Sequence, residues 1–297
     1  MTDKLESLKN EYAGFSMNEK AVNQMKSRIE MAKVENKIEA RKRHIRGWAI
    51  AAAAALTIFI LPNSNASVAN AMSNVPVMGG FFSAITIRDY HSDSKNATAS
   101  VEVNGLKSND KTGKKTADEI NREIKSLTNK YVADFKQTKK ADGKVDLDVK
   151  VDLDVSTDII AKTDNYFTLK LTAVEAQADS YQENHYYTID LNTKKQVKLA
   201  DLFKKNTDYK TAIKNDIKKQ MLEHEKESED VSYFVSESVE DKKITGFSDD
   251  DLVSKASFYL DKNGNIVICY NQGDVAPMYM GALEFTLDKN AVADILK

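Results

Sequence analysis

The chain has 297 residues, of which 41% are hydrophobic and 30% charged, and it contains three prolines and one cysteine. This composition excludes wholesale disorder, an internal disulfide and a cysteine-rich zinc site, and the length allows one or two globular domains. The formal net charge of −2 hides an asymmetry. Residues 1–46 carry 11 basic and 7 acidic side chains, residues 47–71 carry no charge, and the remainder carries 32 basic and 38 acidic side chains.

The first 46 residues are predicted to form short helices with little core of their own. Ser16 and Glu19 fit a capping box, in which each side chain bonds a free backbone N–H at the helix start. Val22, Met25 and Ile29 follow at helical spacing and form an apolar stripe. A solvated helix with modest packing would show the same stripe. Because so short a segment has no core to cover it, we expect a partner protein to bind there.

An uncharged, alanine-rich run, Gly47–Leu61, follows basic residues at 41–46. As a helix it would span roughly 22 Å, which is short for a ~30 Å hydrocarbon core and suits a signal peptide. With the small residues up to Val68, it is long enough to cross a bilayer. The preceding basic cluster predicts that the N-terminus is cytoplasmic. We therefore expect 47–68 to be a single transmembrane, signal-like helix in the cell membrane, with an extracytoplasmic body.

Small residues after this run predict a proteolytic site. Ala69 and Ala71 occupy the −3 and −1 positions of a signal-peptidase cut before Met72, and Ser64–Ala66 is a second match. Residues 69–84 are therefore expected to hold the cleavage site and a juxtamembrane linker, which lies along the membrane or packs onto the body.

Residues 85–191 are predicted to form an antiparallel sheet crossed by one helix. A capping box at Thr116–Glu119 predicts that the helix begins there and runs for about 24 residues. Its apolar face has a helical period and consists of Ile120, Ile124, Leu127, Tyr131 and Phe135. Strand-like alternation occurs at 85–87, 99–103, 166–174 and 186–191, with residues 178–185 joining the last two strands.

Two near-copies, Lys144–Val149 and Lys150–Val155, repeat the pattern Lys-Val-Asp-Leu-Asp-Val. The alternation places the apolar residues on one face and the charged residues on the other, as in a half-solvated strand. An Asp-x-Asp pair can belong to a calcium loop, but the sequence lacks the glycine and the downstream glutamate that complete one. We therefore expect a solvated strand rather than a metal site.

Residues 192–297 are predicted to form a second mixed region, so that the fold class is α+β. A turn at 192–195 leads into a helical region opened by Ala200–Phe203, and a longer helix follows with apolar residues every four positions, at Tyr209, Ile213, Ile217 and Met221. Residues 258–268 have the pattern of a hairpin with Asn263-Gly264 at its turn, and a closing strand covers 283–287. Cys269 lies in an apolar run, which favours a buried thiol over a reactive one.

The loop Asp274–Gly281 carries two methionines and Tyr279 beside Pro277. Exposed aromatic and methionine side chains on a loop are costly unless they pack inward or meet a partner. Chemistry alone favours inward packing slightly.

No motif of a catalytic or metal site occurs, neither H-E-x-x-H, nor G-x-S-x-G, nor a phosphate-binding glycine loop. The histidines, which are His44, His91, His185 and His224, are scattered in polar sequence, where a surface position is expected. We therefore expect no catalytic residues, no metal, no cofactor, and a binding or signalling protein rather than an enzyme.

The order of these features resembles a membrane-bound anti-sigma factor of the RsiV type over nearly the whole chain. Residues 85–191 resemble a PdaC-like domain, and residues 192–297 resemble an RsiV C-terminal domain. The matching motifs are Tyr187–Leu191, Leu199–Phe203 and Val275–Gly281, and Ala71–Gly79 is similar to the family's segment after the membrane helix.

This resemblance implies a mechanism. Residues 1–46 would be cytoplasmic helices that inhibit an extracytoplasmic-function (ECF) sigma factor of the σV type through Val22, Met25 and Ile29, with no direct nucleic-acid contact. The outer body would be a lysozyme receptor with contacts at Ser180-Tyr181 and at Pro277, Met278 and Tyr279. Signal peptidase would then cut between Ala71 and Met72. A site-2 intramembrane protease would cut within Gly47–Leu61 and free the sigma factor.

The acidic body agrees with a lysozyme receptor, because lysozymes are typically basic and opposite charge speeds capture. Two other functions stay open. One is a membrane-tethered peptidoglycan-binding protein related to polysaccharide deacetylases, although the sequence lacks the metal-binding His and Asp cluster of a deacetylase domain. The other is a constitutively secreted protein with a long basic N-terminal region.

Overall fold

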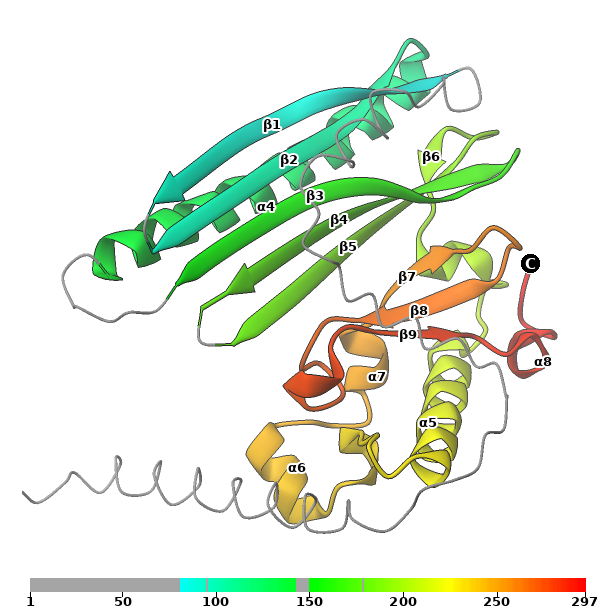
Figure 1. The fold of residues 1–297 in the computed structure, drawn as a ribbon. Helices are drawn as coiled ribbons and strands as arrows, with labels where there is room; N and C mark the ends of the chain where they lie inside the picture. Colours follow the sequence, from blue (N-terminus) through cyan, green and yellow to red (C-terminus); the bar gives the residue numbers. More distant parts are fainter. Residues whose placement is uncertain (1–80, 95, 143–149, 178) are drawn as a thin grey trace, which may run out of the picture. The chain divides into compact units, whose positions relative to one another are not determined.

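The computed structural model describes residues 81–94, 96–142, 150–177 and 179–297 (Figure 1). The predicted sigma-binding helices, transmembrane helix and cleavage site lie outside the described residues. Within those ranges, no helix is long and apolar enough to cross a bilayer. The fold is α+β, with two sheets and packed helices.

The larger sheet has six strands in chain order. Alternating apolar side chains of β2, β3 and β4 are buried on the helix side, as the period of two requires. The solvated-strand prediction for Val151–Val155 is confirmed in β3, where Val151, Leu153 and Val155 are buried; residues 143–149 are outside the described part. The strands are β1 Phe82–Ser94, β2 Ala97–Ser108, β3 Val151–Lys162, β4 Tyr166–Ala176, β5 Ser180–Asp190 and β6 Lys195–Gln196.

The prediction of a purely antiparallel sheet is wrong at one pair. β2 and β3 run parallel, while the other neighbours are antiparallel. The reason is the connection: a parallel pair needs a crossover of a dozen or more residues, and the helix α4 (Lys111–Asp142) supplies it. The helix returns the chain to the end of the sheet where β2 began, so β3 starts in the same direction (Figure 1).

The start of α4 also differs from the prediction. Asp110 Oδ1 accepts hydrogen bonds from the backbone N–H groups of Thr112 and Gly113, each at 2.9 Å, so the helix begins more than one turn before Thr116. Thr116 lies inside the helix, and its hydroxyl donates to the carbonyl oxygen of Lys194 at 2.7 Å. The predicted apolar face is confirmed, because Ile120, Ile124, Tyr131 and Phe135 are buried and Leu127 packs against the same core.

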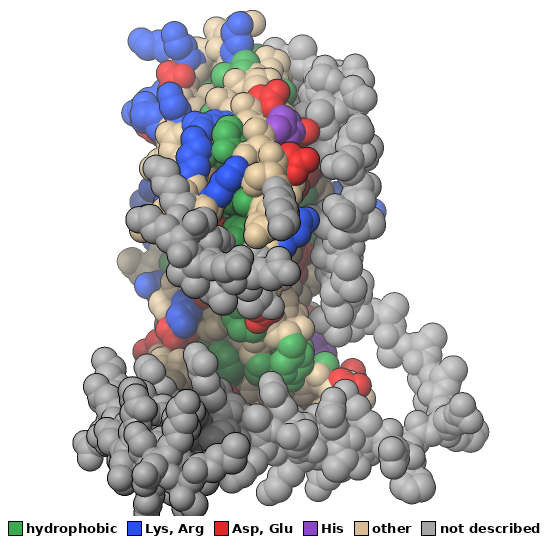
Figure 2. All heavy atoms as spheres, turned by 60° about the vertical axis from the view of Figure 1, so that its left-hand side comes forward, with side chains coloured by type: hydrophobic (Ala, Val, Ile, Leu, Met, Phe, Trp, Pro, Cys, Tyr) green, Lys and Arg blue, Asp and Glu red, His purple; other side chains and the backbone are tan. Residues whose placement is uncertain are grey.

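The opposite face of α4 is solvent-exposed and rich in lysine. Figure 2 shows Lys and Arg side chains gathered on this side of the molecule. Exposed cations on the helix include Lys115, Arg122, Lys125 and Lys136. Lys136 also lies over the ring of Tyr90 at 4.8 Å from its centroid. The acidic excess of the body is therefore concentrated on other surfaces.

The second region has a three-stranded sheet, in the order β7-β8-β9, covered by helices. The predicted helix and hairpin are confirmed: Ile213, Ile217 and Met221 of α5 are fully buried, and Gly264 takes a positive φ of 80° between β7 and β8. Cys269 is buried in β8. The elements are η1 Leu199–Leu202, α5 Tyr209–Glu227, η2 Phe234–Ser236, α6 Val239–Thr245, α7 Asp251–Ser254, β7 Ser257–Leu260, β8 Ile266–Tyr270, η3 Met278–Met280, β9 Leu283–Thr286 and α8 Lys289–Val292.

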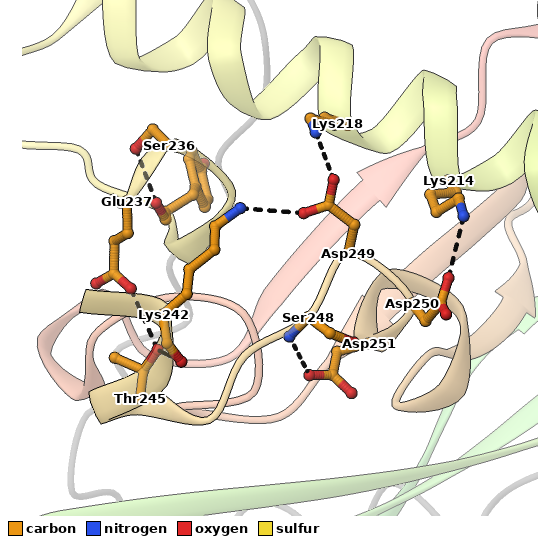
Figure 3. A network of polar contacts seen from close by, with 11 residues as sticks. Lys214, Lys218, Ser236, Glu237, Lys242, Thr245, Ser248, Asp249, Asp250 and Asp251 are labelled. Atoms are coloured by element: carbon orange, nitrogen blue, oxygen red, sulfur yellow. Dashed lines mark hydrogen bonds and ion pairs between the residues drawn. The ribbon is translucent and has the colours of Figure 1, made fainter. Parts of the chain in front are cut away.

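A polar network fastens the small helices to α5 (Figure 3). The Asp249 carboxylate receives Lys218 of α5 on one oxygen and Lys242 of α6 on the other, and Lys214 pairs with Asp250 at 3.0 Å. The hydrogen bond from Lys218, with further help from Lys242, lowers the pKa of Asp249 below its ordinary value. This network fixes α6, which has few buried residues of its own.

The two regions have separate apolar cores, the first ending at Leu191 and the second beginning at Phe203. They contact each other through β5 and β4. The ring of Tyr186 stacks on that of Tyr259 at 5.4 Å, both hydroxyls donate to the carboxylate of Glu284, and Tyr166 donates to the carbonyl oxygen of Asp261. The segment predicted to join β4 and β5 is mostly strand, because β5 extends back to Ser180.

Candidate partner-binding site

The structure brings together two of the predicted contact segments, although 90 or more residues separate them in sequence. The amide Nε2 of Gln272 donates to the carbonyl oxygen of Ser180 at 2.9 Å and to that of Met278 at 2.7 Å. One nitrogen therefore joins the start of β5 to η3. We call the surface formed by Ser180, Tyr181, Pro277, Met278 and Tyr279 the two-loop platform.

The start of β5 is held by amide side chains from the other region. The N–H of Gln182 donates to Gln272 Oε1 at 2.8 Å, and the N–H of Asn184 donates to Asn271 Oδ1 at 2.7 Å. Among the described residues, β6 pairs with β5 only at Ile189 and Asp190. These side chains thus supply the bonds that a neighbouring strand would make along the first half of β5.

The loop after β8 is anchored just before Pro277. Val275 and Ala276 are buried in the second core, and the N–H of Phe234 donates to the carbonyl oxygen of Val275 at 2.9 Å. Gly273 has a φ of 84°, and a Cβ there would come within 2.7 Å of Met278 Sδ. A side chain at this position would be strained and would displace the methionine.

Beyond Pro277 the loop turns outward. The exposed fraction is 67% for Tyr279, 38% for Met278 and 37% for Tyr181. The slight preference for inward packing is therefore wrong for Met278 and Tyr279 and right for Met280, which packs against the second core. The reason is the short 3₁₀ turn of η3. In this turn the N–H of Met280 donates to the carbonyl oxygen of Pro277 and that of Gly281 to Met278, so the side chains of Met278 and Tyr279 face outward.

Carboxylates surround both tyrosines. Burial, followed by the charges of Glu183, Asp274 and Glu175, raises the pKa of Tyr181. Burial and the neighbouring Asp134 and Glu183 raise the pKa of Glu175 above 4.5.

The same effect reaches Tyr279 and Asp274. Burial, then Asp230 and Glu225, raises the pKa of Tyr279, and burial raises the pKa of Asp274. Acidic side chains therefore border the platform, and opposite charge would favour a basic partner there.

Two histidines are not the isolated surface residues that the sequence predicts. His185 Nε2 lies 3.0 Å from the hydroxyl oxygen of Tyr131 and 3.1 Å from Glu183 Oε1, between β5 and α4. His224 Nδ1 lies 3.2 Å from the hydroxyl oxygen of Tyr233, and its ring stacks on Phe285. Both act as structural contacts. Within the described ranges, no group of three or more His, Cys, Asp or Glu residues is arranged to hold a metal ion.

Sequence reasoning missed Asn271 and Gln272. No local signal distinguishes their amides, because their partners on β5 are distant in sequence. The other predicted site residues lie outside the described part of the chain: the cleavage residues Ala69, Ala71 and Met72, and the sigma-binding residues Val22, Met25 and Ile29.

Comparison with known proteins finds one family model and one curated relative. Residues 200–290 match the model of a family described as "Protein of unknown function (DUF3298)". The chain is similar to Anti-sigma-V factor RsiV of Bacillus subtilis, with 26% identity over 260 residues, covering 87% of each protein. The predicted resemblance to RsiV-type anti-sigma factors is confirmed by this similarity, which supports an anti-sigma factor role.

Two solved structures are also similar. One is a member of the DUF3298 family from Bacteroides fragilis, with 17% identity, a TM-score of 0.45, and coverage of 73% of this chain and 93% of that one. The other is a DUF3298 family protein from Pseudomonas aeruginosa, with 12% identity, a TM-score of 0.48, and coverage of 73% and 94%.

Proposed function

We propose that this chain is a membrane-bound anti-sigma factor that senses lysozyme. The observation that carries the proposal is the similarity to RsiV over 87% of both chains. In this proposal, residues 1–46 hold an ECF sigma factor of the σV type inactive in the cytoplasm, and residues 47–68 tether the protein in the membrane. The role is that of a regulator rather than of an enzyme.

The proposed receptor surface is the two-loop platform. Its exposed tyrosines are side chains that often dominate the energetics of protein interfaces. The carboxylates of Glu183 and Asp274 beside Tyr181 suit a basic enzyme such as lysozyme. Pro277 limits the backbone freedom of the segment that carries Tyr279, so little entropy is lost when it enters a cleft.

Release of the sigma factor would follow from proteolysis. Bound lysozyme would allow signal peptidase to cut between Ala71 and Met72, and a site-2 protease would then cut within Gly47–Leu61. In this scheme the short apolar run acts as a tether until the ligand binds, and as a signal peptide afterwards.

Lysozyme binding to the full-length chain in detergent tests the receptor proposal. We expect saturable binding that weakens with salt, and no binding of the intact chain to isolated peptidoglycan without lysozyme. If the chain binds peptidoglycan and not lysozyme, the function is that of a tethered wall-binding protein instead.

A further inference from the structure

The side chain of Gln272 bonds to both segments of the two-loop platform. Its amide makes three hydrogen bonds, which are two donated by Nε2 to Ser180 and Met278 and one accepted by Oε1 from Gln182. Its own N–H points to the carbonyl oxygen of Gln182 at 3.5 Å. Because each of these bonds goes to the backbone of β5 or η3, the side chain of Gln272 holds the two segments at a fixed separation.

The free edge of β5 explains why an amide is needed. Gln182 and Asn184 direct their N–H groups away from β4, and an unpaired strand edge is costly to bury and prone to wrong pairing. An amide side chain offers one acceptor and two donors, which matches the alternating N–H and C=O groups of the edge. Asn271 uses its acceptor for Asn184 in the same way, but it makes no bond to η3.

The loop has few other restraints on Tyr279. The fully buried anchor ends at Ala276, and Met280 packs against the second core while only partly buried. The backbone bonds donated by Met280 and Gly281 stay within the turn of η3. Within the described part of the chain, Gln272 links the turn to the strand, because its Nε2 donates both to the carbonyl oxygen of Met278 in η3 and to that of Ser180 in β5.

We propose that Gln272 is a positioning residue for partner binding, which sets Tyr279 in register with Ser180-Tyr181 by clamping the backbone of both segments. This inference rests on the proposed function. Gln272 acts through Tyr279 rather than by contributing its own contact energy. Because β5 and η3 already lie at the right separation before binding, the loop loses less conformational entropy when the partner binds.

The test uses the full-length chain in detergent and a matched pair of variants. Gln272→Met keeps the length of the side chain and removes all three bonds. The control Asn271→Leu removes a comparable bond to β5 and leaves the link to η3 intact. Amide hydrogen exchange at Met280 and Gly281 reports the order of η3 without any partner.

We expect Gln272→Met to speed exchange at these two amides by about tenfold or more, and Asn271→Leu to leave it unchanged. Gln272→Met should also weaken binding of egg-white lysozyme by about tenfold, mainly through faster dissociation. In a Tyr279→Ala background the same substitution should have almost no further effect, because a residue that acts through Tyr279 is not additive with it.

Equal exchange rates in the two variants would overturn the positioning role. Additive losses in the double variant would overturn it too, since Gln272 would then contact the partner itself. If the unmodified chain fails to bind lysozyme, the proposed function fails, and the exchange measurement alone decides whether Gln272 orders the turn.

Discussion

Removing the ring of Tyr279 is the sharpest single perturbation of the platform. A tyrosine side chain can bury ~200 Å², and 67% of this one is exposed and therefore available to a partner. About 130 Å² covered on binding, at ~25 cal/mol per Å², sets an upper value of ~3 kcal/mol. Allowing for incomplete burial, Tyr279→Ala should cost at least ~2 kcal/mol of binding free energy, which is roughly a 30-fold loss of affinity.

The fold should tolerate this change. Tyr279 packs against no core residue, and exposed substitutions usually change stability by less than ~0.5 kcal/mol. The assay is calorimetric titration of the full-length chain with lysozyme, together with thermal unfolding. Ile160→Ala serves as the control, because Ile160 is also an exposed apolar residue and lies near the opposite end of the sheet from Ser180.

The result that refutes this reasoning is an affinity within about threefold of the unmodified chain for Tyr279→Ala, with an unchanged unfolding temperature. Tyr181→Ala should cost less binding free energy than Tyr279→Ala, because only 37% of Tyr181 is exposed. If Tyr181→Ala costs more than Tyr279→Ala, the partner engages mainly β5 and not the loop.

Four further predictions concern charge, stability and inhibition. Replacing Glu175 with Gln should slow lysozyme association several-fold at low salt and hardly at all at high salt; equal slowing at both would exclude steering. Because the pKa of Glu175 is raised, a cationic partner should lower it, so binding just above pH 4.5 should release a proton. This proton release should not occur at pH 8 or in the Gln variant. Calorimetry in two buffers measures the number of protons released. Asp249→Asn should destabilise the fold by up to ~1 kcal/mol at neutral pH. Because the pKa of Asp249 is lowered in the folded state, this difference should vanish as the pH falls below 3.8. Chemical unfolding of both proteins at neutral and at acidic pH checks this. Replacing Val22, Met25 and Ile29 together with Asp should release the sigma factor, and co-purification that persists would place the interface elsewhere.

Local patterns predicted the elements but not the pairing of strands. The three- and four-residue spacing of Ile120, Ile124, Leu127 and Tyr131 identified the buried face of α4, because a helix repeats its faces at that spacing. The parallel pairing of β2 and β3 depends on where the crossover helix delivers the chain, which no alternation within either strand encodes. Competing caps explain the shifted helix start, since Asp110 and Thr116 are both good cap residues. In the fold Asp110 caps the helix, whereas the hydroxyl of Thr116 donates to the carbonyl oxygen of Lys194.

The candidate site shows the same division. Pro277 and Tyr279 are predicted as contacts only by the resemblance to RsiV-type anti-sigma factors, since the chemistry of the loop alone slightly favours inward packing. Gln272 carries no such signal, since a glutamine beside a turn is ordinary until its distant partners on β5 are known. Tertiary contacts therefore determine how the platform is assembled.

The central claim is that the chain holds a sigma factor until lysozyme binds outside. The most direct measurement recovers the full-length chain from membranes before and after lysozyme treatment. The amount of sigma factor that co-purifies and the N-terminal residue of the outer fragment are determined in the same sample. The account predicts that sigma factor is bound to the intact chain beforehand, and that afterwards it is lost and the fragment begins at Met72. An intact chain that retains its sigma factor after lysozyme treatment would contradict the account.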